Sequence, residues 1–269
     1  MRWFLSLEGV TGRDNFVLFF SKLLFAFEAV FLYHSISGGQ ADKLIERLHF
    51  PGPLTIRTRY GFLAQVTRFL EYVLFTRDFE PEVVGRIDVE DRTRTFIDVG
   101  ANYGFYSLYV ASRNRKSVII AIEAFDKVFE ALANNVKIND YQNIKCLNCA
   151  AWKEDNIDIN LYLNKDSISN PSVVFGGENF VSVPARTIDS IVSENRISKV
   201  DWLKIDVESA EVFVLQGAKK TLEVTANVLL EIHTEENGLV CERILKDAGF
   251  QIETIRQAKA QIYNVHASK

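Results

Sequence analysis

An acidic residue and two glycines that could hold a polar ligand lie close together in the segment Asp98-Val-Gly-Ala-Asn-Tyr-Gly104. Gly100 permits a tight turn and lets the backbone approach a ligand closely. The helix expected after this loop offers free backbone N–H groups to a carboxylate, and Asp98 could receive the ammonium group of an amino-acid moiety. The spacing differs from the G-x-G-x-x-G of dinucleotide-binding loops, which argues against a nicotinamide oxidoreductase. The alternative interpretation is a glycine-containing turn without a ligand. We therefore predict that Asp98, Gly100, Asn102 and Gly104 bind a cofactor.

A further acidic residue, Glu123, ends the next apolar run. In nucleotide-binding sheets, a carboxylate about 20 residues beyond the glycine loop accepts hydrogen bonds from the ribose hydroxyls. The alternative is a solvated residue at the end of a strand. We predict that Glu123 binds the ribose of the cofactor, and we add Ala150, which follows the third apolar run, to the cofactor-binding residues.

Three carboxylates follow a fourth apolar run in Lys204-Ile-Asp-Val-Glu-Ser-Ala-Glu211. Lys204 and Asp206 would point to one face of a strand, and Asp206, Glu208 and Glu211 would gather at its carboxyl end. Such a cluster is expected to raise the pKa values of its carboxylates, which suits a general base. Two alternatives are a divalent cation held by oxygen ligands and acidic residues that interact with a helix dipole. We predict that Asp206 and Glu208 are catalytic.

The segment Glu231-Ile-His233 ends a fifth apolar run, with Glu231 and His233 on one face. A histidine beside a carboxylate at this edge is a candidate proton acceptor, whereas a single histidine at a strand end is more often structural. We predict that His233 is catalytic and rank it after Asp206 as the base.

The elements that must position these residues alternate between short apolar runs and longer amphipathic ones. This alternation predicts a mostly parallel, doubly wound α/β sheet of seven strands with helices on both faces, whose ligands lie at the carboxyl ends of the strands. The expected strands are residues 95–99, 117–122, 144–148, 200–206, 228–232, 251–256 and 261–265, and the expected helices are 105–113, 126–139, 210–222 and 235–248. The polar segment 164–179 is expected to be a loop that acts as a lid or contacts the acceptor.

The N-terminal part of the chain differs from the rest, because residues 16–36 are strongly apolar. Lys22 and Glu28 argue against a membrane span, since each mid-membrane charge costs about 2.5–3.5 kcal/mol. We expect a helix buried on the core or in a homodimer interface, with peripheral membrane contact as the alternative. With breaks at Ser37-Gly-Gly39 and Pro51-Gly-Pro53, the predicted division is a helical appendage over 1–53, a lead-in segment over 54–92 and a catalytic domain over 93–269.

Composition limits the partners and the compartment. The formal net charge of −4 argues against nucleic acid, because duplex binding relies on clustered Lys and Arg. Three cysteines are too few for a disulfide framework and fit the cytoplasm, with membrane association as the alternative. Cys146 and Cys149 lack the second ligand pair of a zinc site, so we predict two core thiols there and no metal ligands in the chain.

Four motifs in this order and spacing resemble the FkbM family of methyltransferases, over about residues 90–265. They are Phe96-Ile-Asp-Val-Gly-Ala-Asn-Tyr-Gly104, Arg186-Thr-Ile-Asp189, Lys204-Ile-Asp-Val-Glu-Ser-Ala-Glu211 and Leu230-Glu-Ile-His233. The resemblance implies a Rossmann-like sheet and S-adenosylmethionine as methyl donor, with Asp98, Gly100 and Gly104 in the cofactor loop, Glu123 on the ribose, and Asp206 and Glu208 near the methyl-transfer site. It also implies O-methylation of a small-molecule or glycan hydroxyl.

One residue departs from the family pattern. The family has Gly after the Val-Glu pair, and this chain has Ser209. If that glycine adopts a positive φ or admits the acceptor, Ser209 would alter the fit of the acceptor. The alternatives to a glycan O-methyltransferase are an inactive member that acts as a scaffold and a methyltransferase that acts on RNA or protein.

Overall fold

The computed structural model describes residues 8–19, 49–68, 75, 80–87, 94–164, 167–172, 178–259 and 262–269. The chain divides into two compact units. Unit 1 comprises residues 1–79 with 137–140, and unit 2 comprises residues 80–136 with 141–269. Unit 2 thus begins 13 residues before the catalytic domain that we predict from the sequence, and it contains every predicted site residue.

Among the described residues of unit 1, three antiparallel strands form a small sheet: β1 (Glu8–Gly9), β2 (His49–Arg57) and β3 (Leu63–Arg68). Leu54 and Ile56 of β2 and Val66 of β3 are fully buried in its core. The break expected at Pro51-Gly-Pro53 lies inside β2, where the pairing with β3 skips from His49 to Leu54. Because proline lacks the N–H that a sheet requires, this stretch interrupts the pairing without ending the strand.

The apolar stretch predicted at 16–36 lies outside the described residues beyond position 19. Residues 12–19 are helical. Within the ranges that the structure describes, no helix has the length and hydropathy needed to cross a bilayer.

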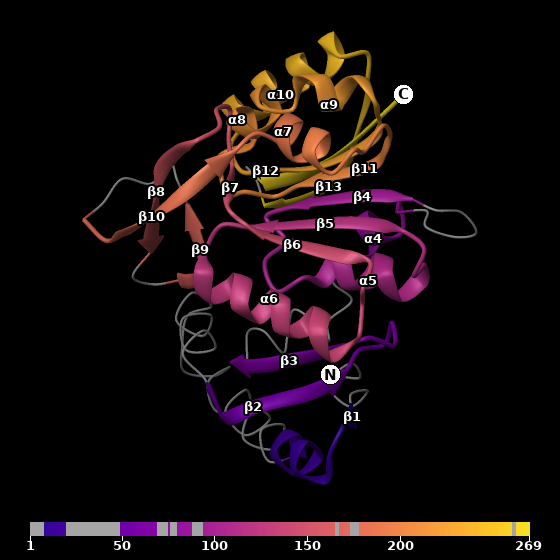
Figure 1. Ribbon diagram of the computed structural model, residues 1–269, viewed down its shortest axis with the longest axis vertical. Coiled ribbons are helices and arrows are strands. Elements are labelled where there is room, and N and C mark those ends of the chain that lie inside the picture. The colour runs from indigo at the N-terminus through magenta and orange to yellow at the C-terminus, as the bar shows by residue number, and fades with distance from the viewer. Residues whose placement is uncertain are drawn as a thin grey trace. The chain divides into compact units, whose positions relative to one another are not determined.

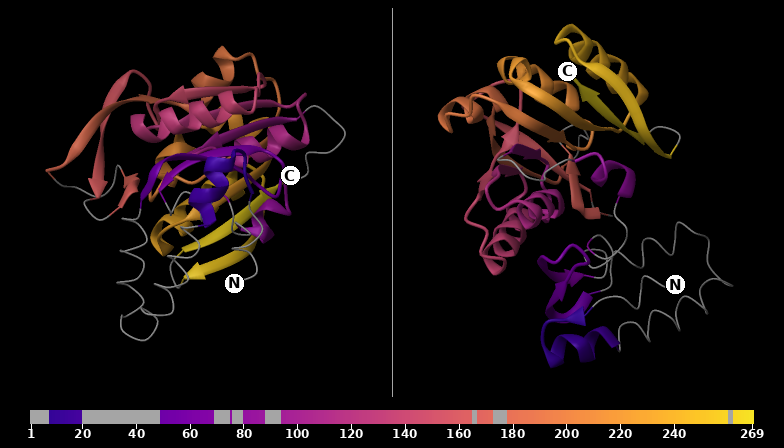
Figure 2. Two further views of the ribbon diagram at one scale, coloured as in Figure 1. Left: turned by 90° about the horizontal axis from the view of Figure 1, so that it is seen from below. Right: turned by 90° about the vertical axis from the view of Figure 1, so that its right-hand side faces the viewer.

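Unit 2 is built on a sheet of seven described strands in the order β13-β14-β12-β11-β4-β5-β6. Only β14 among these seven runs against the others, because it pairs antiparallel with both β12 and β13, and β13 and β14 form one edge of the sheet (Figure 2). This confirms the predicted mostly parallel seven-stranded sheet. The strand bounds are β4 Thr95–Val99, β5 Val118–Glu123, β6 Ile144–Asn148, β11 Val200–Ile205, β12 Thr225–Ile232, β13 Gln251–Lys259 and β14 Ile262–Ser268.

Helices cover both faces of this sheet (Figure 1). On one face lie α4 (Pro81–Val84), α5 (Phe105–Arg113) and α6 (Asp126–Ile138). On the other lie α7 (Ile188–Glu194), α8 (Glu211–Gln216), α9 (Lys219–Glu223) and α10 (Glu235–Asp247). Strands that are buried on both faces carry almost uninterrupted apolar residues, as in β5, whose sequence is Val-Ile-Ile-Ala-Ile-Glu. The core therefore lies between the sheet and its two helical layers, and polar side chains concentrate at the strand ends.

Two expectations from the sequence were wrong. The helix expected over 210–222 is two short helices, because Gly217 ends α8 at a point where its backbone packs against Trp152, leaving no room for a Cβ. Within the segment 164–179, which we expect to be a loop, Asn164 and residues 167–172 belong to a second sheet of four described strands, in the order β7-β10-β8-β9. These strands are β7 Ala150–Ala151, β8 Ile157–Asn164, β9 Ser167–Ser172 and β10 Phe180–Arg186.

Candidate cofactor pocket and acidic cluster

The glycine loop begins where β4 and β11 end side by side. The backbone N–H of Asp206 donates to the carbonyl of Val99 at 3.0 Å. Gly100 follows with φ +72°, and a Cβ at this position would lie 1.8 Å from the carbonyl oxygen of Asp206. Only glycine fits this crossing. Asn102 also has a positive φ, 52°, a conformation that Asn tolerates better than most residues.

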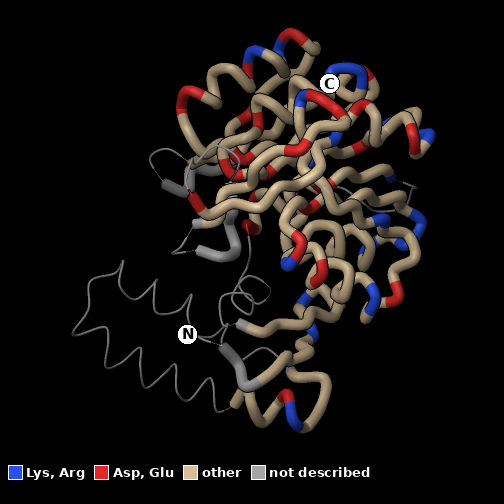
Figure 3. Tube along the Cα trace, turned by 60° about the vertical axis from the view of Figure 1, so that its left-hand side comes forward, with Lys and Arg blue, Asp and Glu red and all other residues tan. Residues whose placement is uncertain are grey.

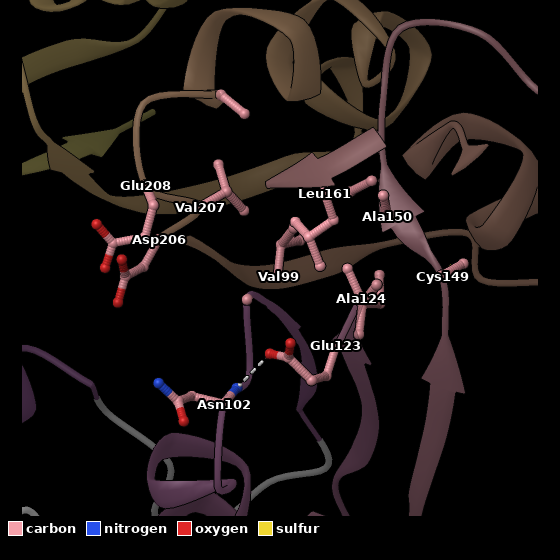
Figure 4. Close-up of a pocket in the computed structure, with 14 residues that line it drawn as sticks. Val99, Asn102, Glu123, Ala124, Cys149, Ala150, Leu161, Asp206, Val207 and Glu208 are labelled. Carbon is pink, nitrogen blue, oxygen red and sulfur yellow. Dashed lines mark hydrogen bonds between the residues drawn. The ribbon is translucent and has the colours of Figure 1, made fainter. Parts of the chain in front are cut away.

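Glu123 links the end of β5 to this loop. One carboxylate oxygen accepts the backbone N–H of Asn102 at 2.9 Å, and the other accepts that of Phe125 at 3.0 Å (Figure 4). Burial raises the pKa of Glu123, although these two hydrogen bonds act in the opposite direction. Each carboxylate oxygen keeps a further lone pair, so the group can still accept hydrogen bonds from a ligand.

A pocket of about 680 Å³, counting the part open to solvent, lies in front of the loop. Its acidic and polar lining consists of Asn102, Glu123, Asp206 and Glu208, and Figure 4 shows the last two carboxylates side by side, separate from Glu123. The remaining lining is mostly apolar: Val99, Ile122, Ala124, Cys149, Ala150, Ala151, Leu161, Val207 and Ala210. An apolar wall with a few polar groups is typical of a small-molecule site.

Four of the residues predicted to bind a cofactor line the pocket together with Asp206 and Glu208: Gly100, Asn102, Glu123 and Ala150. Their contacts with a cofactor stay a prediction. Sequence reasoning missed Leu161, which enters the pocket from β8. Its alternation with polar neighbours in β8 could have indicated a strand, but nothing in the sequence relates that strand to the pocket.

Asp98 and Gly104 occupy other places. The Asp98 carboxylate is fully buried, and one of its oxygens accepts from the backbone N–H of Ser107 at 3.1 Å and from its hydroxyl at 2.7 Å. Gly104 caps α5 with φ +92° and faces Leu132. Neither residue is in the pocket lining. Here Asp98 holds the start of α5 against β4, and its contact with a cofactor ammonium stays a prediction.

Lys204 is the buried cation at the centre of the acidic cluster. Its Nζ lies 3.2 Å from an Asp206 carboxylate oxygen, 3.7 Å from Asp98 Oδ1 and 3.4 Å from the carbonyl oxygen of Gly100. It also lies 5.0 Å from the centre of the Tyr106 ring. Burial would lower the pKa of Lys204, but the carboxylates around it, Asp206 first, raise it. Lys204 thus ties the glycine loop to the end of β11 and is positively charged at neutral pH.

Glu80 is a site residue that sequence reasoning missed. Its carboxylate accepts a hydrogen bond from the Tyr106 hydroxyl, and Tyr106 in turn faces Lys204. Burial, followed by the charge of Glu80, raises the pKa of Tyr106 well above its usual value. The Glu80-Pro81 pair could have signalled the start of a helix. No sequence pattern indicates that the side chain of Glu80 reaches α5.

Asp206 and Glu231 form a hydrogen-bonded carboxyl pair with pKa shifts in opposite directions. Burial would raise the pKa of Asp206, but the charges of Lys204 and His233 outweigh it and lower that pKa. Burial and the charge of Asp206 raise the pKa of Glu231 to about 9. The prediction that clustering raises carboxylate pKa values was therefore wrong for Asp206, because two cations face it.

His233 lies between two further carboxylates. Its Nδ1 is 2.8 Å from Glu211 Oε1, and its Nε2 is 3.3 Å from Glu208 Oε2. Burial would lower the pKa of His233, but the hydrogen bond to Glu211 and the charge of Glu208 raise it to about 9. Burial raises the pKa of Glu208 to about 7. At neutral pH His233 is protonated in this arrangement, which argues against its predicted role as the proton acceptor and leaves Asp206 and Glu208.

The second of the four motifs, Arg186-Thr-Ile-Asp189, is structural in this chain. Thr187 caps α7 by accepting the backbone N–H of Ser190. The Asp189 carboxylate accepts the backbone N–H groups of Lys220 and Thr221 at 3.1 and 2.7 Å. These contacts fasten α7 to α9 and do not involve the pocket lining.

The chain is similar to known methyltransferases. The family model described as the methyltransferase FkbM domain matches residues 98–252. Methyltransferase sdnD of Sordaria araneosa is 26% identical over 190 residues, which cover 58% of this chain and 73% of that protein. Methyltransferase 1 of Beauveria bassiana (strain ARSEF 2860) is 22% identical over 182 residues, which cover 60% and 73%. Among solved structures, that of M. jannaschii TYW2 in complex with AdoMet is 11% identical with a TM-score of 0.44, covering 80% of this chain and 84% of that one.

Proposed function

Because the chain belongs to the FkbM family of methyltransferases, we propose that it methylates a hydroxyl oxygen of a sugar, a glycan or a related small molecule. Its cofactor is S-adenosylmethionine, which supplies the methyl group. The observation that carries the proposal is the position of the Asp206 and Glu208 carboxylates, which line the same pocket as Glu123. A hydroxyl bound between them would lie beside the cofactor with a proton acceptor at hand.

The pocket residues fit this cofactor. Glu123 offers carboxylate oxygens to the ribose hydroxyls, and Ala150, Ile122 and Leu161 offer an apolar surface to the adenine. Gly100 brings the backbone to the pocket surface, where a Cβ would overlap Asp206. Asn102 has a buried Oδ1 that has no hydrogen-bond partner among the described residues, and buried polar atoms of that kind normally find one.

The acidic cluster is suited to hold and deprotonate the acceptor. Asp206 has a lowered pKa, so it is ionised at neutral pH and accepts a hydrogen bond from the hydroxyl. Lys204 fixes this carboxylate at 3.2 Å. Correct placement of two reactants contributes a large part of the rate in such reactions. We propose Asp206 as the proton acceptor, with Glu208, whose pKa is about 7, as the second candidate.

Charge favours a small or glycan acceptor over a nucleic acid. Basic and acidic residues are interspersed along the trace of unit 2 (Figure 3), and the formal net charge is −4. Asp206 and Glu208 make one side of the pocket lining acidic. An acceptor phosphate at this edge would be repelled, whereas a sugar hydroxyl would donate hydrogen bonds to it.

The test is a calorimetric titration of the full chain with S-adenosylmethionine, followed by methyl-transfer assays on a panel of sugars and glycans. We expect binding that Glu123→Gln weakens about 10- to 100-fold, because a charged acceptor is lost. Glu154→Gln changes an exposed carboxylate in the same way and should leave binding unchanged. Folded protein that does not bind the cofactor would refute the proposal. Binding without transfer to any acceptor would favour a scaffold, and transfer only to RNA or protein would replace the acceptor class.

A further inference from the structure

Three side chains at the edge of the pocket combine the donor types of a metal site. We propose that Asp206, Glu208 and His233 bind a divalent cation of the Mn²⁺ or Mg²⁺ class, which holds the hydroxyl group of the acceptor. The role of the cation rests on the proposed function, whereas its binding does not. The sequence predicts no metal ligands and leaves a divalent cation on the carboxylates of Asp206, Glu208 and Glu211 as an alternative, but it does not indicate His233 as a ligand.

The geometry of the donors supports this proposal. One carboxylate oxygen from Asp206, one from Glu208 and a ring nitrogen of His233 all lie within 4.8 Å of one another. The Nε2 of His233 and Oε2 of Glu208 are 3.3 Å apart, which suits two ligands that each lie about 2.0–2.2 Å from one ion. The donors follow two neighbouring parallel strands, β11 and β12, so the sheet itself holds them together.

A residue outside this trio orients the histidine. Glu211 is fully buried and accepts from His233 Nδ1 at 2.8 Å. Glu211 is itself fixed by the backbone N–H of Ser209 at 2.8 Å and by the amide of Asn237 at 3.3 Å. A carboxylate on the second ring nitrogen is the usual partner of a metal-binding histidine. It directs Nε2 toward Glu208, which lines the pocket.

The charge of the cluster also favours a cation. When a cation replaces the Nε2 proton of His233, the carboxylates of Asp206, Glu208 and Glu211 outnumber Lys204, the basic side chain that remains beside them. Buried charges of one sign require compensation. The sulfonium of S-adenosylmethionine would compensate only one of them, so a divalent ion and the cofactor can be bound together.

The chemistry of this ligand set matches the acceptor proposed above. Two carboxylates and one imidazole suit Mn²⁺ or Mg²⁺ better than metals that prefer thiolates. With three protein ligands, such an ion keeps open positions for an acceptor oxygen. A bound cation lowers the pKa of a hydroxyl group that it holds, and the carboxylate oxygen of Asp206 that does not bind the ion would take up the proton.

The test is Mn²⁺ binding to the full chain after treatment with a chelator, followed by electron paramagnetic resonance. We expect one strongly bound ion per chain and nitrogen modulation from a coordinated imidazole in the unaltered protein. Glu208→Gln and His233→Gln should each weaken binding at least about tenfold, whereas Glu154→Gln should not. The nitrogen signal needs no variant, so a variant that fails to fold does not remove the test.

Absence of bound Mn²⁺, or bound Mn²⁺ without the nitrogen signal, would overturn the proposal. Titration with S-adenosylmethionine in the presence of a chelator separates this failure from that of the proposed function. If the cofactor binds and Mn²⁺ does not, the cluster is a metal-free ion-pair network and the proposed function stands. If Mn²⁺ binds with the nitrogen signal and the cofactor does not bind, the metal site stands and the proposed function fails.

Discussion

The two sides of the pocket hold polar groups in different ways. On the side of Glu123, the carboxylate is bonded to the backbone N–H groups of Asn102 and Phe125. On the side of Asp206, side chains contact side chains, and Lys204 and His233 face several carboxylates. In the first arrangement, the backbone conformation fixes the position of the Glu123 carboxylate. The second arrangement depends on which of these side chains are protonated and on the acceptor or cation that binds beside them. We therefore expect changes at the two sides to affect different measurable quantities.

The largest contrast should come from Asp206→Asn beside Glu123→Gln. Removal of the proposed proton acceptor should lower kcat about 10²- to 10⁴-fold, because an amide cannot take up the proton of the hydroxyl. The affinity for S-adenosylmethionine should stay within a few fold. Glu123→Gln should do the reverse, raising the dissociation constant while kcat at saturation is largely kept. Kinetics with an active acceptor, together with calorimetry, measures both.

Two outcomes would contradict this contrast. If Asp206→Asn abolished cofactor binding as strongly as Glu123→Gln does, the two sides would form a single unit. If kcat stayed unchanged in Asp206→Asn and fell in Glu208→Gln, the proton acceptor would be Glu208.

Gly100→Ala should destabilise the backbone that both sides share. A Cβ at this position would lie 1.8 Å from the Asp206 carbonyl oxygen, with φ at +72°. The strain and the overlap together should cost about 2–5 kcal/mol of unfolding free energy, or displace the ends of β4 and β11 so that the cofactor no longer binds. Denaturant unfolding and calorimetry would detect either result.

Gly12→Ala is the matched control, because no described atom beyond its chain neighbours and its own helix backbone lies within 4 Å of the added Cβ, and its φ is not positive. A stable Gly100→Ala variant with unaltered cofactor affinity would show that Gly100 does not pack against the carbonyl oxygen of Asp206 with a positive φ.

The stability of the metal-free protein should fall as the pH rises from about 6.5 to 9. The pKa of His233 is raised to about 9 by Glu211 and Glu208, and that of Glu231 to about 9 by burial and Asp206. In this range the folded state binds more protons than the unfolded state, so stability decreases with pH. The stabilisation by His233 is complete below about 6.5, its unfolded pKa, and is lost as the pH passes 9.

Unfolding by urea at several pH values in the presence of a chelator measures this effect, which we expect to be about 1–3 kcal/mol. His233→Gln should flatten the pH dependence. A stability that rises over this range would mean that the cluster is ionised differently.

Much of unit 2 could be predicted from sequence because its strands are short apolar runs bounded by polar residues. The bounds of β4, β6 and α5 match the expected ranges, since Gly100, Gly104 and the apolar periodicity mark them locally. The second sheet was missed because β9 and β10 carry Ser, Asn and Pro. Their pairing with β8, rather than their own composition, makes them strands.

For the candidate site, the sequence predicts which residues lie at the same edge of the sheet, but it does not predict all of their contacts. Residues at strand ends could be placed on one edge, because parallel strands bring their carboxyl ends together. Lys204 and Asp206 could also be placed on one face of a strand, but the effect of Lys204 on the pKa of Asp206 and the contact of Glu80 could not be predicted. Lys204 lowers the pKa of Asp206, and Glu80 reaches Tyr106 from outside the four motifs. Such contacts depend on side-chain distances, which no spacing in the sequence encodes.

The smallest effect concerns Ser209, the residue at which the chain departs from its family. Ser209 has φ +80°, and the preceding Glu208 has φ +50°. Left-handed backbone costs an L-residue about 1–2 kcal/mol, whereas glycine adopts it freely but loses more entropy on folding. Ser209→Gly should therefore raise the unfolding free energy by about 0.5–1 kcal/mol. The backbone contacts of Ser209 with Glu211 and Asn237 would be kept.

Thermal unfolding would measure this gain, with Ser193→Gly in α7 as the control. Ser193 is helical and has no positive φ, so glycine there should destabilise the protein instead. If Ser209→Gly gained stability and kept kcat, the serine would be a tolerated substitution. If it gained stability but lost activity toward the acceptor, the strained serine would help to hold Glu208 at the acidic side of the pocket.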